Sequence, residues 1–191
     1  TTDSSELSAF GTALTTAYPS VNYTYTSNRV KFTYADSTIL YINQSSTGVS
    51  INDTYKTNGS SQITSVEVLY GVTSLTLGTG AFMGCTVLST FTISSSVTSL
   101  TLGQDAFMNC TGLTTFTIPS SVIHNQSSFT IPSYLFYNAG ISSFTILSPV
   151  TTLIINESAF GNCDFLQSFI VPDDVTTLTI KYLAFTACKS L

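Results

Sequence analysis

Apolar residues recur along this chain with two periods, a long one of 25 residues and a short one of two residues inside each repeat. Residues 72–96 and 97–121 are identical at 19 of 25 positions, and further copies begin near Val122, Val150 and Val175. A period in the twenties is typical of solenoids, in which each unit buries its apolar face against its neighbours. The pattern therefore predicts a stack of similar coils.

Within one repeat the pattern predicts two short strands and a tight turn. SLTLG (99–103) alternates polar and apolar residues, as does LTTFTI (113–118), and this alternation indicates strands. AFMNC (106–110) lies between them and is expected to form a tight helical or 3₁₀ turn. The residues expected to point inward are Leu100, Leu102, Ala106, Phe107, Cys110, Leu113, Phe116 and Ile118.

The third repeat departs from the others. It carries about four extra residues near 123–126 and one fewer near Gly140, and Ala139 replaces the cysteine of the motif. An insertion in one coil usually forms a loop on one face, where ligands often bind. The alternative is that the solenoid tolerates the insertion without using it.

The repeated motifs VTSLTLGQDAFMNCTGL (97–113) and VPDDVTTLTIKYLAFTACKSL (171–191) resemble the BspA-like leucine-rich repeat family. The resemblance covers about 63–191 and rests on the A-F-x-x-C turn. It implies an α/β repeat solenoid, a right-handed leucine-rich-repeat-like coil stack with short strands and 3₁₀ or helical turns. It also implies display or secretion by bacteria or parasitic protists, with adhesion to host or matrix proteins. The 25-residue repeat length departs from the family pattern.

Residues 1–62 do not repeat and are expected to form a small α+β cap before about five repeats at 63–191. SSELSAFGTALTTAY predicts a short amphipathic helix, and residues 21–43 predict three strands with turns near Ser27-Asn28 and Ala35-Asp36. Residues 44–62 are expected to form a loop. The alternative for this segment is an independent binding module.

The sequence stops partway through a repeat, and two explanations remain open. The natural chain continues beyond this point, or another subunit covers the open coil. In the second case head-to-tail contacts would build a filament. The residues expected at this assembly end are Leu178, Ile180, Phe185 and Leu191.

Composition narrows the choice of partner. Charged residues make up 8% of the chain, against about 25% in average proteins. The net charge of −5, with only 5 Lys and Arg, argues against nucleic acid and against anionic membranes, which attract clustered cations. No apolar run approaches the roughly 18 residues of a membrane span.

The sequence favours an extracellular or cell-surface location. It begins without methionine, as expected of a mature form after signal removal or of a fragment of a longer chain. It also holds Asn-X-Ser/Thr sequons that a secreting eukaryote would glycosylate in polar loops. Asn109 lies inside a repeat and is expected to stay unmodified. The glycosylation candidates are Asn22, Asn43, Asn52, Asn58, Asn125 and Asn156.

The chain shows no pattern typical of catalysis, so we expect no enzyme activity, no cofactor and no metal. The only histidine, His124, has no partner pattern for a nucleophilic triad. Asp173 and Asp174 are a weak calcium alternative, since calcium takes six or more oxygens. The four cysteines share one repeat position and lack zinc spacing. We expect them to be buried free thiols, with bridges between adjacent coils as the alternative.

Outward threonines and serines form two columns that repeat along the stack. Such arrays resemble the faces of β-solenoid ice-binding proteins, but Glu67, Ile154 and Ile170 interrupt them. We therefore expect non-enzymatic adhesion or recognition of an extracellular protein or glycan, with a head-to-tail filament subunit as the alternative. The expected binding surface comprises Thr90, Thr92, Thr115, Thr117, Ser143 and Thr145.

Overall fold

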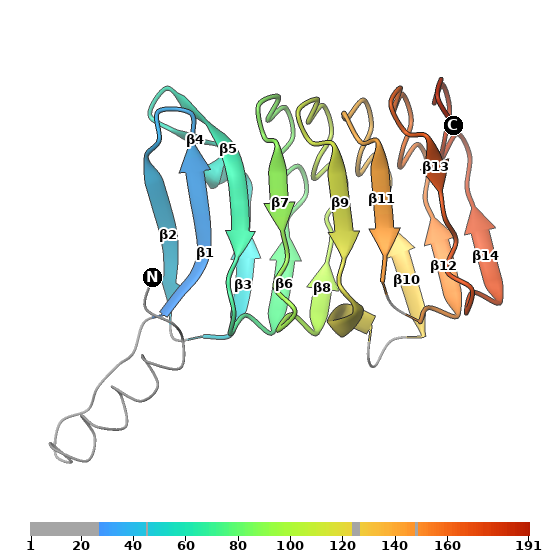
Figure 1. The fold of residues 1–191 in the computed structure, drawn as a ribbon, viewed down its shortest axis with the longest axis horizontal. Helices are drawn as coiled ribbons and strands as arrows, with labels where there is room; N and C mark the ends of the chain where they lie inside the picture. The colour runs from blue at the N-terminus through green and yellow to red at the C-terminus, as the bar shows by residue number, and fades with distance from the viewer. Residues whose placement is uncertain (1–26, 45, 124–126, 148) are drawn as a thin grey trace, which may run out of the picture.

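The computed structural model describes residues 27–44, 46–123, 127–147 and 149–191. These residues form a β-solenoid of about five coils, stacked along the long axis of the molecule (Figure 1). Each coil contains one strand, a tight turn, a second strand and a corner. The repeat solenoid expected from the sequence is confirmed.

The strands form two columns along the stack, because equivalent strands of adjacent coils lie side by side and parallel. The first column comprises β3 (Gly48–Ile51), β6 (Ser74–Leu77), β8 (Ser99–Thr101), β10 (Ser128–Ile131), β12 (Thr152–Ile155) and β14 (Thr177–Ile180). The second comprises β5 (Ser61–Val68), β7 (Thr90–Thr92), β9 (Thr115–Ile118), β11 (Ser143–Ile146) and β13 (Ser168–Phe169).

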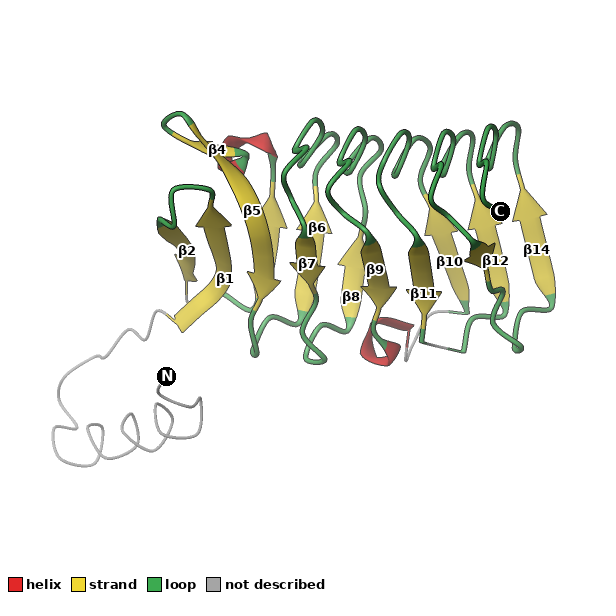
Figure 2. Ribbon diagram, turned by 45° about the horizontal axis from the view of Figure 1, so that its top comes forward, coloured by secondary structure: helices red, strands yellow, loops and turns green. Residues whose placement is uncertain are grey.

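The N-terminal end of the stack is covered by antiparallel strands. β1 (Ser27–Tyr34) lies between β2 (Ile39–Gln44) and β5, and β4 (Thr57–Asn58) pairs with the other edge of β5. The 3₁₀ turn η1 (Asp53–Tyr55) lies beside β4 (Figure 2). Buried β1 side chains, Phe32 among them, cover the first coil, as the cap prediction requires.

Two expectations for the cap can be compared with the structure. The turn near Ala35-Asp36 is confirmed, since the N–H of Ser37 donates to the carbonyl of Tyr34 at 2.9 Å. The turn near Ser27-Asn28 is wrong, because the chain there is already in β1 and shows only a bulge after Asn28. The amphipathic helix lies outside the described residues.

The loop expected at residues 44–62 is also wrong in part. Val49 and Ile51 are buried, and β3 pairs in parallel with β6 in the same register that later coils use. The parallel column therefore begins at Gly48, in a segment whose sequence departs from the repeat. The division of the chain at residue 62 itself stays a prediction.

The expected helical turn between the two strands is a series of β-turns instead. The N–H of Ala81 donates to the carbonyl of Gly78 at 3.1 Å within the coil, and that of Phe82 donates to Ala106 in the next coil at 2.8 Å. An α-helix needs negative φ at successive residues. Positive φ recurs here at Gly80, Gly84, Asp105, Asn109, Tyr134, Asn138, Ser158, Asn162, Leu183 and Ala187.

Two ladders of phenylalanine rings run through the core. The turn ladder stacks Phe82, Phe107, Phe136, Phe160 and Phe185, with ring centroids 5.3–5.5 Å apart. The strand ladder comprises Phe91, Phe116, Phe144 and Phe169. Rings of the two ladders meet edge to face, the geometry that aromatic quadrupoles favour. The core of the solenoid is therefore built from side chains that stack between adjacent coils.

Each column is interrupted once within the described strands. In the first column, β3, β6 and β8 form one sheet, and β10, β12 and β14 form another. In the second column, β7 pairs with β5 and not with β9. The turns nevertheless stay bonded across both interruptions: the N–H of Phe107 donates to Leu135 at 2.9 Å beside β8 and β10, and that of Phe82 donates to Ala106 at 2.8 Å beside β7 and β9. The coils therefore separate along their strands while their turns remain joined.

Candidate functional site

The six residues of the expected binding surface lie together on the outer side of β7, β9 and β11, and we call this surface the hydroxyl face. The parallel ladder aligns Ser143 with Thr115 and Thr145 with Thr117. Five of the six side chains are exposed, and Thr145 is half-buried. Alternation explains their exposure, because the intervening Phe91, Phe116 and Phe144 fill the core.

Two hollows border the central strands of the hydroxyl face. One of about 220 Å³ lies between β7 and β9, at the ladder interruption, and is lined in part by Phe91, Ile93 and Pro119. A smaller one of about 120 Å³ lies between β11 and β13, near Ile170. The repeat pattern gave no sign of either hollow, because the alternation of polar and apolar residues is the same with or without a hollow between adjacent strands.

The hydroxyl face offers neutral hydrogen bonds beside apolar carbon. Each Ser or Thr hydroxyl donates one hydrogen bond and accepts others. A charge appears only at the edge, where Glu67 lies opposite Thr92 and its carboxylate is 3.5 Å from the Lys31 amine. Because β7 does not pair with β9, the hydroxyls on these two strands are not evenly spaced. Ice-binding surfaces need regularly spaced hydroxyls, so this arrangement disfavours ice binding.

The cysteines form part of the core, as expected. All four are free thiols; Cys85, Cys110 and Cys163 are buried, and Cys188 is partly exposed. The Sγ of Cys110 donates to the carbonyl oxygen of Phe82 at 3.1 Å, and Cys163 contacts Phe136 in the same way at 3.0 Å. The thiols therefore join adjacent coils through hydrogen bonds.

Burial makes these thiols hard to ionise. Desolvation raises the pKa of Cys85 to about 11 and that of Cys163 to about 12. The pKa of Cys110 and that of Cys188 are also raised, in both cases mainly by desolvation. Because the thiolate is the reactive form, these groups are unsuited to nucleophilic chemistry at neutral pH.

The sequons differ in their accessibility. Asn52 and Asn58 are exposed, and the Asn52 side-chain oxygen accepts a hydrogen bond from the Thr54 N–H at 3.1 Å. Asn156 is half-buried, with a buried side-chain oxygen that has no hydrogen-bond partner. The Asn43 backbone lies in β2. Asn22 and Asn125 lie outside the described residues.

Among the described residues, no three His, Cys, Asp or Glu side chains gather as a metal site would require. Asp173 and Asp174 are exposed, and His124 lies outside the described residues. In the described part of the chain, no helix has the length and apolar character needed to cross a membrane.

The last coil exposes much of the expected assembly end. Leu178 is 43% exposed, whereas the equivalent Leu153 of the preceding coil is fully buried. Ile180 and Leu191 are exposed as well, and Phe185 is partly buried. The exposed side of the last coil is therefore largely apolar.

Comparison with known proteins identifies part of the chain. Residues 129–191 match the family model described as BspA type leucine rich repeat region (6 copies). This segment is similar to BspA-type leucine-rich repeats. The BspA-type region thus includes β10 to β14 and confirms the resemblance expected from the motifs. Such proteins are typically non-enzymatic and generally belong to the cell surface.

Comparisons with curated proteins and with solved structures support no further conclusion about this chain. No curated protein matches the sequence. The crystal structure of a T. pallidum leucine rich repeat protein is similar at 15% identity, covering 84% of this chain and 87% of that chain, with a TM-score of 0.23. A likeness this weak carries no argument about the present chain.

Proposed function

We propose that this protein is a non-enzymatic recognition protein that binds an extracellular protein or glycan through the hydroxyl face. The observation that carries the proposal is the alignment of exposed hydroxyls on adjacent strands, Ser143 beside Thr115 and Thr145 beside Thr117. A rigid sheet presents these groups in fixed positions, which lowers the entropy lost when a partner binds.

The chemistry of the surface favours uncharged partners with many hydroxyl or amide groups. Its hydroxyls pair with such groups, and the hollow beside Phe91 and Ile93 accepts a small apolar surface. A strongly charged partner would lose hydration without finding an opposite charge, which costs binding free energy. Glycans and neutral stretches of protein fit this description.

An extracellular or cell-surface location accords with this role. The exposed Asn52 and Asn58 are accessible to glycosylation, whereas the buried oxygen of Asn156 disfavours that site. Cell-surface proteins of the BspA type supply the general precedent. Mass spectrometry of the natively expressed protein, before and after glycosidase treatment, tests the location through the modification of Asn52 and Asn58.

The binding proposal is tested with a panel of immobilised glycans and extracellular-matrix proteins. The double variant Thr115→Lys with Thr117→Lys adds charge and bulk to the centre of the hydroxyl face. We expect it to abolish any binding that the unmodified protein shows. The matched control, Thr177→Lys with Thr179→Lys, changes two exposed threonines on β14 of the other column and is expected to bind normally. Equal binding by both variants would exclude the hydroxyl face.

A head-to-tail filament subunit is the second candidate, favoured by the exposed apolar edge of β14. Light scattering with intact mass spectrometry separates the two functions. A recognition protein is expected to be monomeric without its ligand. Large particles of the natural protein with a terminus near Leu191 would favour the filament, and Leu178→Lys with Ile180→Lys should then dissolve them.

A further inference from the structure

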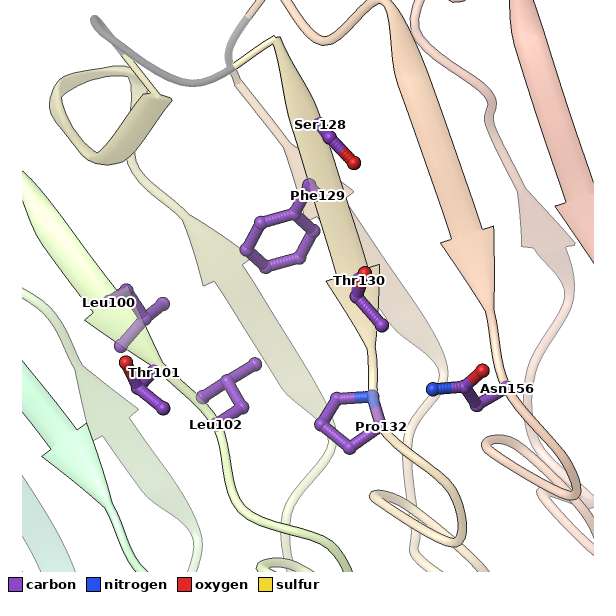
Figure 3. A pocket seen from close by; sticks show the side chains of 8 residues that line it. All are labelled: Leu100, Thr101, Leu102, Ser128, Phe129, Thr130, Pro132 and Asn156. Atoms are coloured by element: carbon purple, nitrogen blue, oxygen red, sulfur yellow. The ribbon is translucent and has the colours of Figure 1, made fainter.

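A groove opens in the first column, where β8 and β10 face each other without pairing. It has a volume of about 320 Å³, near the lower end of the roughly 300–1,000 Å³ common for ligand sites. Figure 3 shows the strands on its two sides, with Phe129 directed from β10 towards Leu100 and Leu102. Nothing in the function proposed above uses this groove.

Pro132 removes one hydrogen bond from the ladder at this point. After β6, β12 and β14, the next residue donates its N–H to the end of the preceding strand: Gly78 to Ile51 at 2.8 Å, Asn156 to Ile131 at 3.0 Å and Lys181 to Ile155 at 2.9 Å. Pro132 occupies this position after β10 and has no N–H to donate towards Leu102. The sequence therefore weakens pairing between β8 and β10 at this end.

The interruption leaves strand edges without partners on both sides of the groove. The N–H of Thr152 donates to the preceding coil, at the carbonyl of Ser127. By the same register, the N–H groups of Ser128 and Thr130 are directed from β10 towards β8, where no ladder bond is formed. Such edges bind extended chains through main-chain hydrogen bonds.

The side chains of the groove indicate what kind of chain fits. Leu100 and Phe129 are buried and form an apolar floor, and Thr101 and Thr130 are exposed at the rim. None of the lining residues is charged, so an ionic ligand would find no counter-charge there. The lining residues are Leu100, Thr101, Leu102, Ser128, Phe129, Thr130, Pro132 and Asn156.

Asn156 lies at one end of the groove, beside Pro132 (Figure 3). Figure 3 shows its amide nitrogen on the Pro132 side and its oxygen directed away from the groove. The buried oxygen has no hydrogen-bond partner, but it is not accessible from the groove. The proposal therefore rests on the unpaired strand edges and the uncharged lining.

We propose that the groove between β8 and β10 binds an uncharged extended peptide segment of a partner protein, which adds as a strand between them. A segment of about four residues matches the length of β10. Apolar residues at alternate positions would cover Leu100 and Phe129, and the intervening residues would lie level with Thr101 and Thr130. This site lies in the first column, so it is separate from the hydroxyl face of the second.

The proposal is tested with the acetylated and amidated peptide TSLTLG, an uncharged sequence with the required alternation. Amide hydrogen exchange is followed by NMR on the whole chain. We expect the peptide to slow exchange at Ser128 and Thr130, in a saturable manner. The peptide TPLPLG keeps both leucines but lacks two N–H donors, and should bind about tenfold or more weakly. Equal affinity for both peptides, or protection confined to β7, β9 and β11, overturns the proposal.

Variants of the groove separate main-chain pairing from other contacts. Thr130→Pro removes an N–H directed into the groove, and Thr130→Ala removes the hydroxyl and methyl groups at the same position but keeps the N–H. We expect the proline variant to lose about tenfold in peptide affinity and the alanine variant to bind normally. If the proline variant does not fold, Ser128→Pro takes its place, because it removes the other N–H directed into the groove, and it is expected to bind severalfold more weakly. An unchanged affinity in the folded variant overturns the proposal, as does groove binding by a neutral glycan but not by TSLTLG.

Discussion

At the scale of single residues, stability is concentrated where the two phenylalanine ladders meet. Phe107 is fully buried and lies 5.5 Å from Phe82 and 5.4 Å from Phe136 along the turn ladder. It also meets Phe91 and Phe116 edge to face, each at 5.1 Å. Removing this ring therefore opens a cavity shared by three coils.

We expect Phe107→Ala to lower the free energy of unfolding by about 3–5 kcal/mol, the usual cost of truncating a buried aromatic residue. Urea unfolding followed by circular dichroism measures the change. The matched control is Phe165→Ala, since Phe165 is 65% exposed, and its effect should stay within about 0.5 kcal/mol. Similar losses in both variants would contradict the assignment of inward positions.

The thiols provide a second prediction at this scale. Iodoacetamide at pH 8 should leave Cys85, Cys110 and Cys163 unmodified in the folded protein and label all 4 cysteines in urea. Cys188 should react first, because it is only partly buried. Intact mass spectrometry counts the adducts. Rapid labelling of the three buried thiols without denaturant would show that the turns holding these cysteines are accessible to solvent, and would contradict their burial.

The same thiols predict a loss of stability at alkaline pH. Burial raises the pKa of Cys85 to about 11 and that of Cys163 to about 12, above an unfolded value of about 8.5. The folded state therefore holds these protons more tightly. Their contribution is complete below pH about 8.5 and is lost as the pH rises towards 11 and 12. Urea midpoints between pH 8 and 11.5 should fall less steeply in Cys163→Ala than in the unmodified protein.

The inward residues were predictable because alternation determines which side chains are buried. Phe107, Cys110 and Phe116 are all buried as the repeat pattern indicated. Leu102 is only partly buried, because its coil lacks a bonded neighbour beside Pro132. Asn156 could not be singled out by the pattern, because the alternation of residues does not record whether a buried side-chain oxygen has a hydrogen-bond partner.

At the scale of elements, glycines determine how closely the coils approach. A Cβ on Gly103 would lie within 2.6 Å of the backbone nitrogen of Thr79 and still closer to Gly78 in the preceding coil. Backbone atoms cannot move aside as the end of a flexible side chain does. The glycine of the SLTLG motif is therefore required by the contact between coils.

We expect Gly103→Ala to destabilise the fold by about 1–3 kcal/mol, as overpacking commonly does. Gly48→Ala is the control, because its added Cβ would meet nothing closer than 3.7 Å. Thermal unfolding of the two variants measures the difference. A stable Gly103→Ala protein would mean that the coils can separate without cost at this point.

Elements that repeat were predictable and those that depart from the repeat were not. The β-turns with positive φ resemble a helical turn in sequence, because Ala106, Phe107 and Cys110 have helix-like spacing. Similarly, β3 departs from the repeat and is recognised only through its pairing with β6. The groove between β8 and β10 depends on an absent hydrogen bond, which a hydrophobic pattern does not record.

At the scale of the whole molecule, stability is expected to vary along the stack. Each coil of a solenoid contacts only its neighbours, so a coil with one neighbour is less stable than one with two. The antiparallel cap covers the first coil through buried side chains of β1 such as Phe32. At the other end, all four residues of β14 are exposed. The two ends of this chain therefore differ in protection.

This difference predicts a gradient of amide hydrogen exchange in the 191-residue chain. Leu153 and Leu178 occupy equivalent positions in adjacent strands, but only Leu153 is fully buried. We expect the amides of β14 to exchange through local opening, faster than those of β12, while β1 and β5 exchange slowly because β1 pairs with strands on both sides and covers the first coil. Peptide-level exchange with mass spectrometry measures the order. Uniform protection from β1 to β14 would show that the stack unfolds as one cooperative unit, and that neighbouring coils do not limit its stability.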